Sequence, residues 1–168
     1  GIIVFYSLSK RNNMTGYRAG FVAGDQKIIE ILKRLKTNID SGTPSIIQEA
    51  AIAALLDNTH HLEMQKLYLE KRNLLLAAIA KLGLVAPKAK ATFYLWLKIP
   101  PILSDIEFAQ KLLDPKIAIV VTPGSLISDE CAQGINPGKG YVRFALMPTV
   151  AEIKEAARRL EQLQNLFV

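Results

Sequence analysis

The chain has 168 residues, of which 50% are hydrophobic and 21% charged, and this composition excludes a disordered polypeptide. Its 21 basic and 15 acidic side chains leave a net charge of +6, but the basic residues are scattered and form no run that would indicate nucleic-acid binding. No apolar run reaches the roughly 18 residues of a membrane span. Cys131 is the only cysteine, which excludes an internal disulfide and agrees with a reducing cytoplasm. We therefore expect a cytoplasmic globular protein with small anionic ligands and with neither nucleic-acid nor membrane partners.

The beginning of the chain predicts part of a parallel sheet. Gly1 to Leu8 is apolar and rich in β-branched residues from its first position, as in a strand buried on both faces. A second short strand is expected from Ala19 to Ala23, after the irregular stretch SKRNNMTGY. Because a buried parallel strand needs neighbours, these two segments predict a fragment of a larger sheet.

Three helices are expected next. Asp25 can cap a helix that carries the apolar residues Ile28, Ile31, Leu32 and Leu35 on one face. Thr43-Pro44 precedes a helix from Ser45 to Leu56, where a proline near the first turn costs no hydrogen bond. A long helix begins at Asn58 or Thr59 and ends at Leu82, before the helix-terminating Gly83.

The rest of the chain alternates between strand and helix. Ser104 with Glu107, and Thr149 with Glu152, have the spacing of capping boxes and predict two helix starts. The second of these helices directs apolar residues inward as far as Phe167. The expected strands are Thr92 to Ile99, Lys116 to Thr122 and Gly140 to Leu146. This order predicts a small α/β domain with a three-stranded sheet and helices packed on it.

Three cationic residues are candidates for chemistry, and each has a purely structural alternative. Lys10 follows the first strand among small polar residues, where partial desolvation would favour the neutral amine that forms Schiff bases with carbonyl cofactors. Alternatively, Lys10 is a solvated loop residue. Arg18 lies between Gly16 and Gly20, which allow close backbone approach and unusual dihedral angles beside a phosphate-binding guanidinium; the alternative is a tight turn. Arg143 interrupts an apolar strand and either reaches solvent or binds a carboxylate.

The spacing of these residues resembles a known family. The constrained positions of the first segment are Ser7-Leu8-Ser9-Lys10, Asn13-Met14, Gly16, Arg18 and Gly20. They resemble the lysine signature of the class I and II aminotransferases, which are fold type I enzymes that depend on pyridoxal phosphate. Later segments follow the family's order: Gln48, Tyr68 to Arg72, Phe93-Tyr94-Leu95-Trp96, Thr122-Pro123-Gly124 and Gly140 to Phe144. The first segment looks most like aminotransferases of the diaminopimelate branch of lysine synthesis, including the N-succinyl type.

The resemblance implies a role for each candidate residue. Lys10 would form the Schiff base with pyridoxal 5′-phosphate and move the proton at the substrate Cα. Ser7 and Arg18 would bind the cofactor phosphate, with help from Ser9. Arg143 would bind the substrate α-carboxylate. No metal is implied. Other family residues that contact the cofactor precede the lysine and are not in this chain, so the cofactor site is expected to be incomplete, and the loop from Ser125 to Lys139 is longer than in relatives.

The resemblance also implies an architecture and an activity. Residues 1–58 would be the end of a large cofactor-binding domain, and residues 59–168 a connecting helix with the C-terminal small domain. The parent would be a homodimer that moves an amino group between an amino acid and a 2-oxo acid such as 2-oxoglutarate, while the chain alone would be inactive. Two alternatives stay open: a pyridoxal-phosphate C–S β-lyase of the same fold, and a non-catalytic ligand-sensing domain of a transcription regulator.

Overall fold

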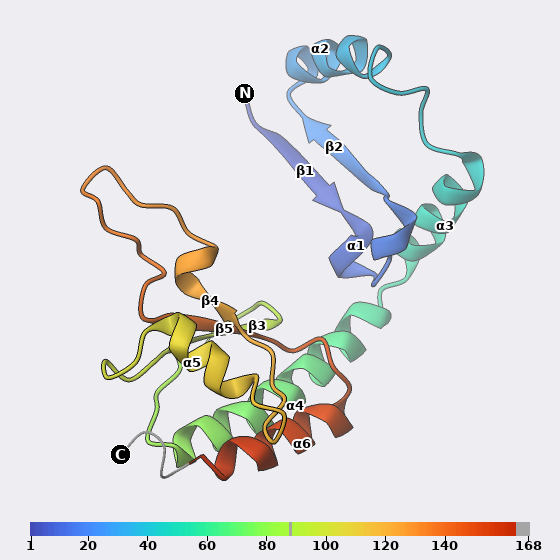
Figure 1. The fold of residues 1–168 in the computed structure, drawn as a ribbon. Coiled ribbons are helices and arrows are strands. Elements are labelled where there is room, and N and C mark those ends of the chain that lie inside the picture. Colours follow the sequence, from blue (N-terminus) through green and yellow to red (C-terminus); the bar gives the residue numbers. More distant parts are fainter. Residues whose placement is uncertain (88, 164–168) are drawn as a thin grey trace. The chain divides into compact units, whose positions relative to one another are not determined.

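A computed structural model describes residues 1–87 and 89–163 of the chain. The chain divides into two compact units, Gly1–Gln65 and Lys66–Val168. Figure 1 shows the elements of each unit in sequence colours. Both units combine small sheets with helices, so the mixed α/β class predicted from the sequence is confirmed.

The first unit opens with an antiparallel pair of strands. β1 (Ile3–Ser7) pairs with β2 (Gly20–Gly24), so that Ile3 lies opposite Gly24 and Ser7 opposite Gly20. The prediction that these two segments belong to a parallel sheet is wrong for this pair, because the loop between them reverses the direction of the chain and β2 runs antiparallel to β1. Val4 and Phe5 are 52% and 69% exposed, so the residues of this chain do not themselves provide the burial expected on both faces of β1.

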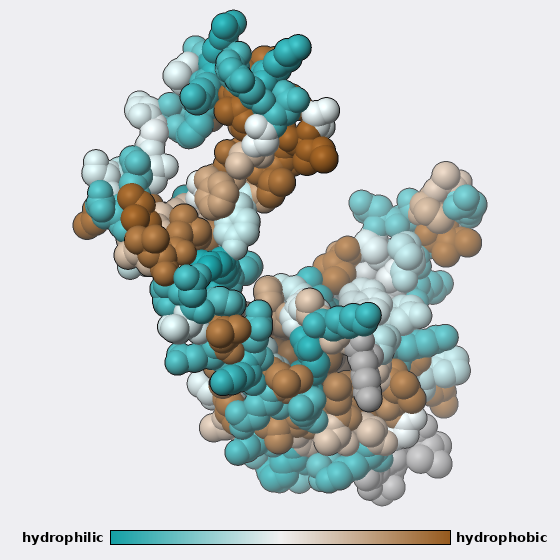
Figure 2. Space-filling view, turned by 180° about the vertical axis from the view of Figure 1, so that it is seen from behind, coloured by the Kyte–Doolittle hydropathy of each residue, from teal (hydrophilic) through white to brown (hydrophobic). Residues whose placement is uncertain are grey.

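Two helices follow in the same unit. In α2 (Gln26–Lys36), the Asp25 carboxylate accepts hydrogen bonds from the amides of Lys27 and Ile28, as the sequence predicts for a cap. The apolar face of α2 is exposed, and Figure 2 shows brown side chains in the part of the molecule that contains α2 and the strand pair. α3 (Ser45–Leu56) has the predicted bounds and contributes to a small core with Leu8, Met14 and Ala19.

The second unit is built on a three-stranded antiparallel sheet. The long helix α4 (His60–Lys81) begins in the first unit and ends before Gly83, whose φ is +72°. The strand order is β3-β5-β4, with β3 at Tyr94–Lys98, β4 at Thr122–Pro123 and β5 at Tyr141–Ala145. On β5 the side chains of Val142 and Phe144 are buried, whereas Tyr141 and Arg143 lie on the other face, as alternation predicts.

Helices α5 (Asp105–Leu112) and α6 (Val150–Glu161) cover this sheet together with α4 (Figure 1). Both predicted capping boxes are present, at Ser104 with Glu107 and at Thr149 with Glu152. The core gathers apolar side chains from all three helices and from β3 and β5, including Leu75, Leu95, Phe108, Val142 and Leu160. Phe167, expected on the inward face of the last helix, lies outside the described residues.

The predicted strand from Lys116 to Thr122 is mostly absent. Only Thr122 and Pro123 pair with β5. The preceding residues bond elsewhere: the amide of Ala118 donates to the Asp114 carbonyl, and that of Ile119 donates to the Leu112 carbonyl at the end of α5. Ala118 has a φ of +50°, which is incompatible with an extended strand. β-branched residues indicated a strand here, but the turn that follows α5 decides the backbone conformation.

Within the described part of the chain, no helix is both long and apolar enough to cross a membrane. The 22-residue α4 has the length, but charged side chains such as Glu63, Lys66, Glu70 and Arg72 interrupt it.

Candidate functional site

Lys10 lies on a single helical turn that directly follows β1. This turn is α1 (Leu8–Arg11), and Ser7 is its N-cap, with the Ser7 hydroxyl accepting a hydrogen bond from the Ser9 amide at 3.2 Å. Leu8 is 1% exposed and anchors the turn in the core of the first unit. The sequence predicted that Lys10 follows a strand end, and the structure places it there, with Ser9 next to it and Ser7 at the cap of the same turn.

Arg18 stands at the other end of the same loop. The Leu8 amide donates to the Ala19 carbonyl at 3.1 Å, and Ser7 lies opposite Gly20 in the strand pair. The two ends of this segment, the lysine loop (residues 7–20), are therefore held together. The structure thus brings Lys10 and Arg18 into one short closed segment, as the sequence reading expects.

The glycines beside Arg18 act differently from each other. A Cβ on Gly20 would lie 2.5 Å from the Tyr6 carbonyl oxygen, so close backbone approach requires glycine there. Gly16 has open space around it and no positive φ. The unusual dihedral angle belongs to Arg18 itself, which is left-handed with a φ of +53° after the turn η1 (Thr15–Tyr17). The expectation that both glycines provide these features is therefore correct only for the close approach at Gly20.

The lysine loop is tied to α3 by polar contacts that the sequence reading did not identify. The Asn12 side-chain amide donates to the Ala54 carbonyl at 2.9 Å, and the Arg11 guanidinium donates to the same oxygen at 3.2 Å. Thr15 donates its hydroxyl proton to the Ser9 carbonyl at 3.0 Å. Together with buried Met14, these contacts fix the backbone that displays the amine.

The functional groups of the loop face outward. Ser7, Lys10 and Arg18 are exposed and Ser9 is half-buried, so the partial burial expected for Lys10 is not provided by the described residues of this chain. The Arg18 guanidinium donates to the Thr15 carbonyl at 3.2 Å. A primary amine, two hydroxyls and a guanidinium on one rigid loop are the groups needed to bind an aldehyde that carries a phosphate.

Arg143 belongs to the second unit, on the outer face of its sheet. Its guanidinium carbon lies 4.4 Å from the centre of the Tyr94 ring, and its Nη2 donates to the Thr122 hydroxyl at 3.4 Å. Its Nε is buried, and no described residue accepts a hydrogen bond from it. Arg143 thus lies on an aromatic face, rather than in open solvent. The sequence alone did not identify Tyr94 or Thr122 as neighbours of Arg143, because the three residues lie on different strands and only the register of the sheet brings them to one face.

Asp105, at the start of α5, is a buried carboxylate that the sequence reading did not single out. It is 3% exposed and accepts a hydrogen bond from the Ser125 amide at 2.8 Å. Burial raises the pKa of Asp105, but hydrogen bonds from Ser125 and from the Gly140 amide outweigh it and leave the pKa below its ordinary value. Asp105 therefore holds both ends of the 125–139 loop.

That loop is also closed at its neck. Ser128 donates to the Gly124 carbonyl at 2.8 Å and accepts from the Gly138 amide at 3.1 Å, while Asn136 donates to the carbonyls of Ser125 and Ser128. A Cβ on Gly138 would lie 2.1 Å from the Gly124 carbonyl oxygen. The backbones of the two segments that form the neck therefore lie in direct contact at these glycines. The rest of the loop, in orange in Figure 1, extends away from the sheet.

We expect Asp105→Ala to destabilise the second unit by about 3 kcal/mol, because the partly buried amides of Ser125 and Gly140 lose a charged acceptor. Circular dichroism should show a melting temperature lower by about 10 °C or more. Since the carboxyl has a lowered pKa, its contribution is present above its ordinary value of 3.8 and is lost as the pH falls through the lower folded value. The difference between variant and wild type should therefore narrow in acid. Asp129→Ala, at an exposed loop position, is the control and should change little.

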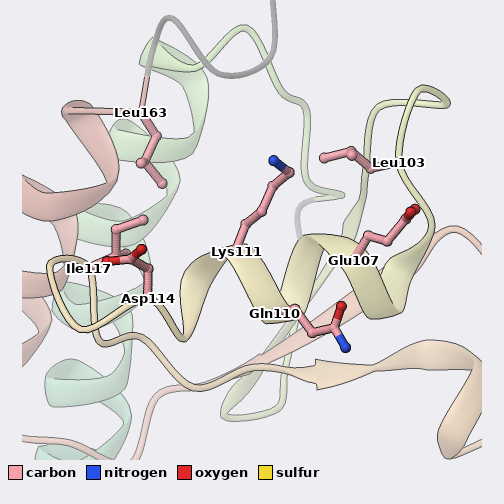
Figure 3. A pocket seen from close by; sticks show the side chains of 7 residues that line it. All are labelled: Leu103, Glu107, Gln110, Lys111, Asp114, Ile117 and Leu163. Carbon is pink, nitrogen blue, oxygen red and sulfur yellow. The ribbon is translucent and has the colours of Figure 1, made fainter.

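Two surface depressions have none of the candidate cations among their lining residues. Figure 3 shows one of about 600 Å³ beside α5, lined by Glu107, Lys111, Asp114 and Leu163 among others. Another, of about 340 Å³, adjoins Leu8 and Ala19 at the base of the lysine loop. In the part of the chain that the structure describes, no three His, Cys, Asp or Glu side chains are grouped to hold a metal ion.

Comparisons with known proteins agree with the geometry. Residues 1–160 match the family described as aminotransferase class I and II. The LL-diaminopimelate aminotransferase of Halothermothrix orenii is 43% identical over 166 residues, which are 98% of this chain and 41% of that protein. The corresponding enzyme of Aquifex aeolicus is 36% identical, over 96% of this chain and 40% of its own length. The chain thus spans about two fifths of these relatives.

Solved structures show the same relationship. An aminotransferase from Neisseria meningitidis is 36% identical with a TM-score of 0.87, over 99% of this chain and 40% of that one. A probable N-succinyldiaminopimelate aminotransferase from Thermus thermophilus is 29% identical with a TM-score of 0.78, over 95% of this chain and 41% of its own.

Proposed function

The chain belongs to the class I and II aminotransferase family, of fold type I, and from this premise we propose that it is the C-terminal part of a pyridoxal-phosphate-dependent aminotransferase. The observation that carries the proposal is the lysine loop, which displays the Lys10 amine and the Arg18 guanidinium from one closed segment. Residues 1–58 would complete a large domain, and residues 59–168 would form the connecting helix and the small domain.

The residues present fit the cofactor. Lys10 supplies an exposed primary amine for its aldehyde, and Ser7, Ser9 and Arg18 supply hydroxyl and guanidinium donors for its phosphate. When bound, pyridoxal phosphate provides the electron sink that stabilises a carbanion at the substrate Cα. The contacts of Asn12 and Arg11 with α3 hold the lysine backbone in place.

Lys10 and Arg143 would divide the work on the substrate. The Lys10 amine would take the proton from the substrate Cα and return it during transfer, as a positioned general base and acid. Arg143 would bind the α-carboxylate with its guanidinium and so orient the Cα–H bond for this proton transfer. The Nε of Arg143 is buried and has no hydrogen-bond acceptor among the described residues. This supports a carboxylate ligand, because an unsatisfied donor on a charged group is costly.

We propose a diaminopimelate-type amino donor, either LL-diaminopimelate or its N-succinyl form, and 2-oxoglutarate as the partner 2-oxo acid. The names of the relatives support the donor class, and the family resemblance supports 2-oxoglutarate and a homodimer in the cytoplasm. Because the relatives are much longer, the isolated chain would be inactive.

The test uses the complete polypeptide that contains this chain, purified with pyridoxal phosphate. With LL-diaminopimelate or its N-succinyl derivative and 2-oxoglutarate, we expect glutamate as product, measured by chromatography. The isolated 168-residue chain should form none. Release of pyruvate and ammonia from cystathionine without glutamate formation would instead show a β-lyase, and no turnover of any amino acid would contradict enzymatic function.

A further inference from the structure

We propose that Tyr94 is a positioning residue for Arg143: the face of its ring holds the guanidinium in the orientation that binds the substrate carboxylate. This inference rests on the proposed function, in which Arg143 binds that carboxylate. It adds a residue whose contribution is electrostatic and orientational, without contact with the substrate itself.

The sheet register places the two side chains side by side. Tyr94 lies opposite Ala145, and Arg143 lies opposite Trp96 on one side and Thr122 on the other. Tyr94 is thus the diagonal neighbour of Arg143 on the same face, within reach of a long side chain. The guanidinium carbon lies 4.4 Å from the ring centre, well inside the range of a cation–π interaction.

This contact leaves the hydrogen-bond donors of Arg143 available. The ring offers no oxygen or nitrogen acceptor to the guanidinium, and the hydrogen bond that the described residues form with Arg143 is the one from Nη2 to Thr122. The Thr122 hydroxyl accepts from only one terminal nitrogen, Nη2, which limits rotation about the end of the side chain. Ring and hydroxyl together therefore select one orientation of a long, flexible side chain before any ligand arrives.

Tyr94 belongs to an aromatic cluster that also contains Tyr68 and Phe93. The centre of the Phe93 ring lies 4.4 Å from that of Tyr94 and 5.9 Å from that of Tyr68. The backbone at this end of the sheet is fixed as well, because the Leu146 amide donates to the Phe93 carbonyl at 2.8 Å.

Two adjacent cations of α4 secure the segments that lead to this cluster. The Arg72 guanidinium donates to the carbonyls of Ala89, Ala91 and Thr92, immediately before β3. Lys71, which is 5% exposed, donates to the Leu146 carbonyl just after β5. Because β3 and β5 are antiparallel, both contacts act at the same end of the sheet. These hydrogen bonds therefore fix the backbone that carries the Tyr94 ring.

The experiment compares Tyr94→Leu and Tyr94→Phe in the complete holoenzyme. We expect Tyr94→Leu to raise KM for both the amino acid and the 2-oxo acid by about 5- to 30-fold, because both present a carboxylate to Arg143. The value of kcat should stay within about twofold of wild type. The absorption spectrum of the bound cofactor should not change. Tyr94→Phe keeps the ring and should restore KM to within about twofold of wild type. Tyr141→Leu, which removes an aromatic ring stacked on Trp96 from the same face, is the matched control.

A substitution that preserves shape separates electrostatics from packing. Pentafluorophenylalanine at position 94 has nearly the shape of phenylalanine but an electron-poor ring, so KM should rise several-fold above that of Tyr94→Phe. This comparison holds even where Tyr94→Leu does not fold. Equal KM values for the two rings would overturn the proposal. If Arg143→Leu itself leaves KM and kcat unchanged, the assignment of Arg143 in the proposed function fails, which is a separate result.

Discussion

Lys10→Ala in the complete polypeptide should abolish covalent attachment of the cofactor and lower kcat/KM by about 10⁴-fold or more. The substitution removes both the amine that bonds to the aldehyde and the base that moves the Cα proton, and each of these contributes several orders of magnitude. Reduction with borohydride followed by mass spectrometry should show the cofactor's mass on the wild-type peptide that contains Lys10, and on no peptide of the variant. Steady-state transamination gives the second readout.

Lys27→Ala is a matched control, since Lys27 is also exposed in the first unit, in the first turn of α2. It should keep both covalent attachment and activity. The lysine loop should stay folded in Lys10→Ala, because its backbone is held by Leu8, Asn12 and Thr15, none of which depends on the amine. Full activity of Lys10→Ala would refute the proposed mechanism outright.

The lysine loop shows what the sequence alone can establish. The pattern from Ser7 to Gly20 indicated the positions of the amine and the guanidinium, and local rules for caps and helix ends correctly predicted α2, α3, α5 and α6. These features depend on residues a few positions apart. The contacts of Arg11 and Asn12 with Ala54 depend on residues more than forty positions away, and no local pattern reveals them.

The errors arose where tertiary partners decide the structure. An apolar, β-branched segment favours a strand but does not specify the direction of the neighbouring strand. The sequence therefore suggested a parallel neighbour for Gly1 to Leu8, whereas β2 runs antiparallel to β1. The same preference suggested a strand from Lys116, whereas hydrogen bonds to the end of α5 turn that backbone away from β5.

The surroundings of Arg143 lay between these cases. Strand alternation alone places Arg143 and Tyr141 on one face of β5, and Tyr94 and Trp96 on one face of β3. It could not predict that these faces coincide or that Tyr94 lies diagonal to Arg143, because that requires the register between β3 and β5. Positioning residues are therefore harder to find than the residue they position.

Arg143→Leu should remove the preference of the complete enzyme for substrates that carry an α-carboxylate. The loss of a partly buried, bidentate charge pair should lower kcat/KM for the amino acid by about 10²- to 10³-fold. The same substitution should have little effect on the already slow reaction of the corresponding amine without the carboxylate. Kinetics with this matched substrate pair thus report the interaction itself, independently of any general loss of active enzyme.

Arg143→Lys should recover little of this activity, because an ammonium group can neither bind a carboxylate with two parallel hydrogen bonds nor stack its plane on the Tyr94 ring. Arg158→Lys, at an exposed site paired with Glu155, is the control and should leave both reactions unchanged. If Arg143→Leu slowed the amino acid and the amine equally, the guanidinium would be serving the fold of the sheet. A selective loss with the amino acid would instead show that the substrate carboxylate binds Arg143 on β5. The ring of Tyr94 and the hydroxyl of Thr122 orient the guanidinium of Arg143 for this contact.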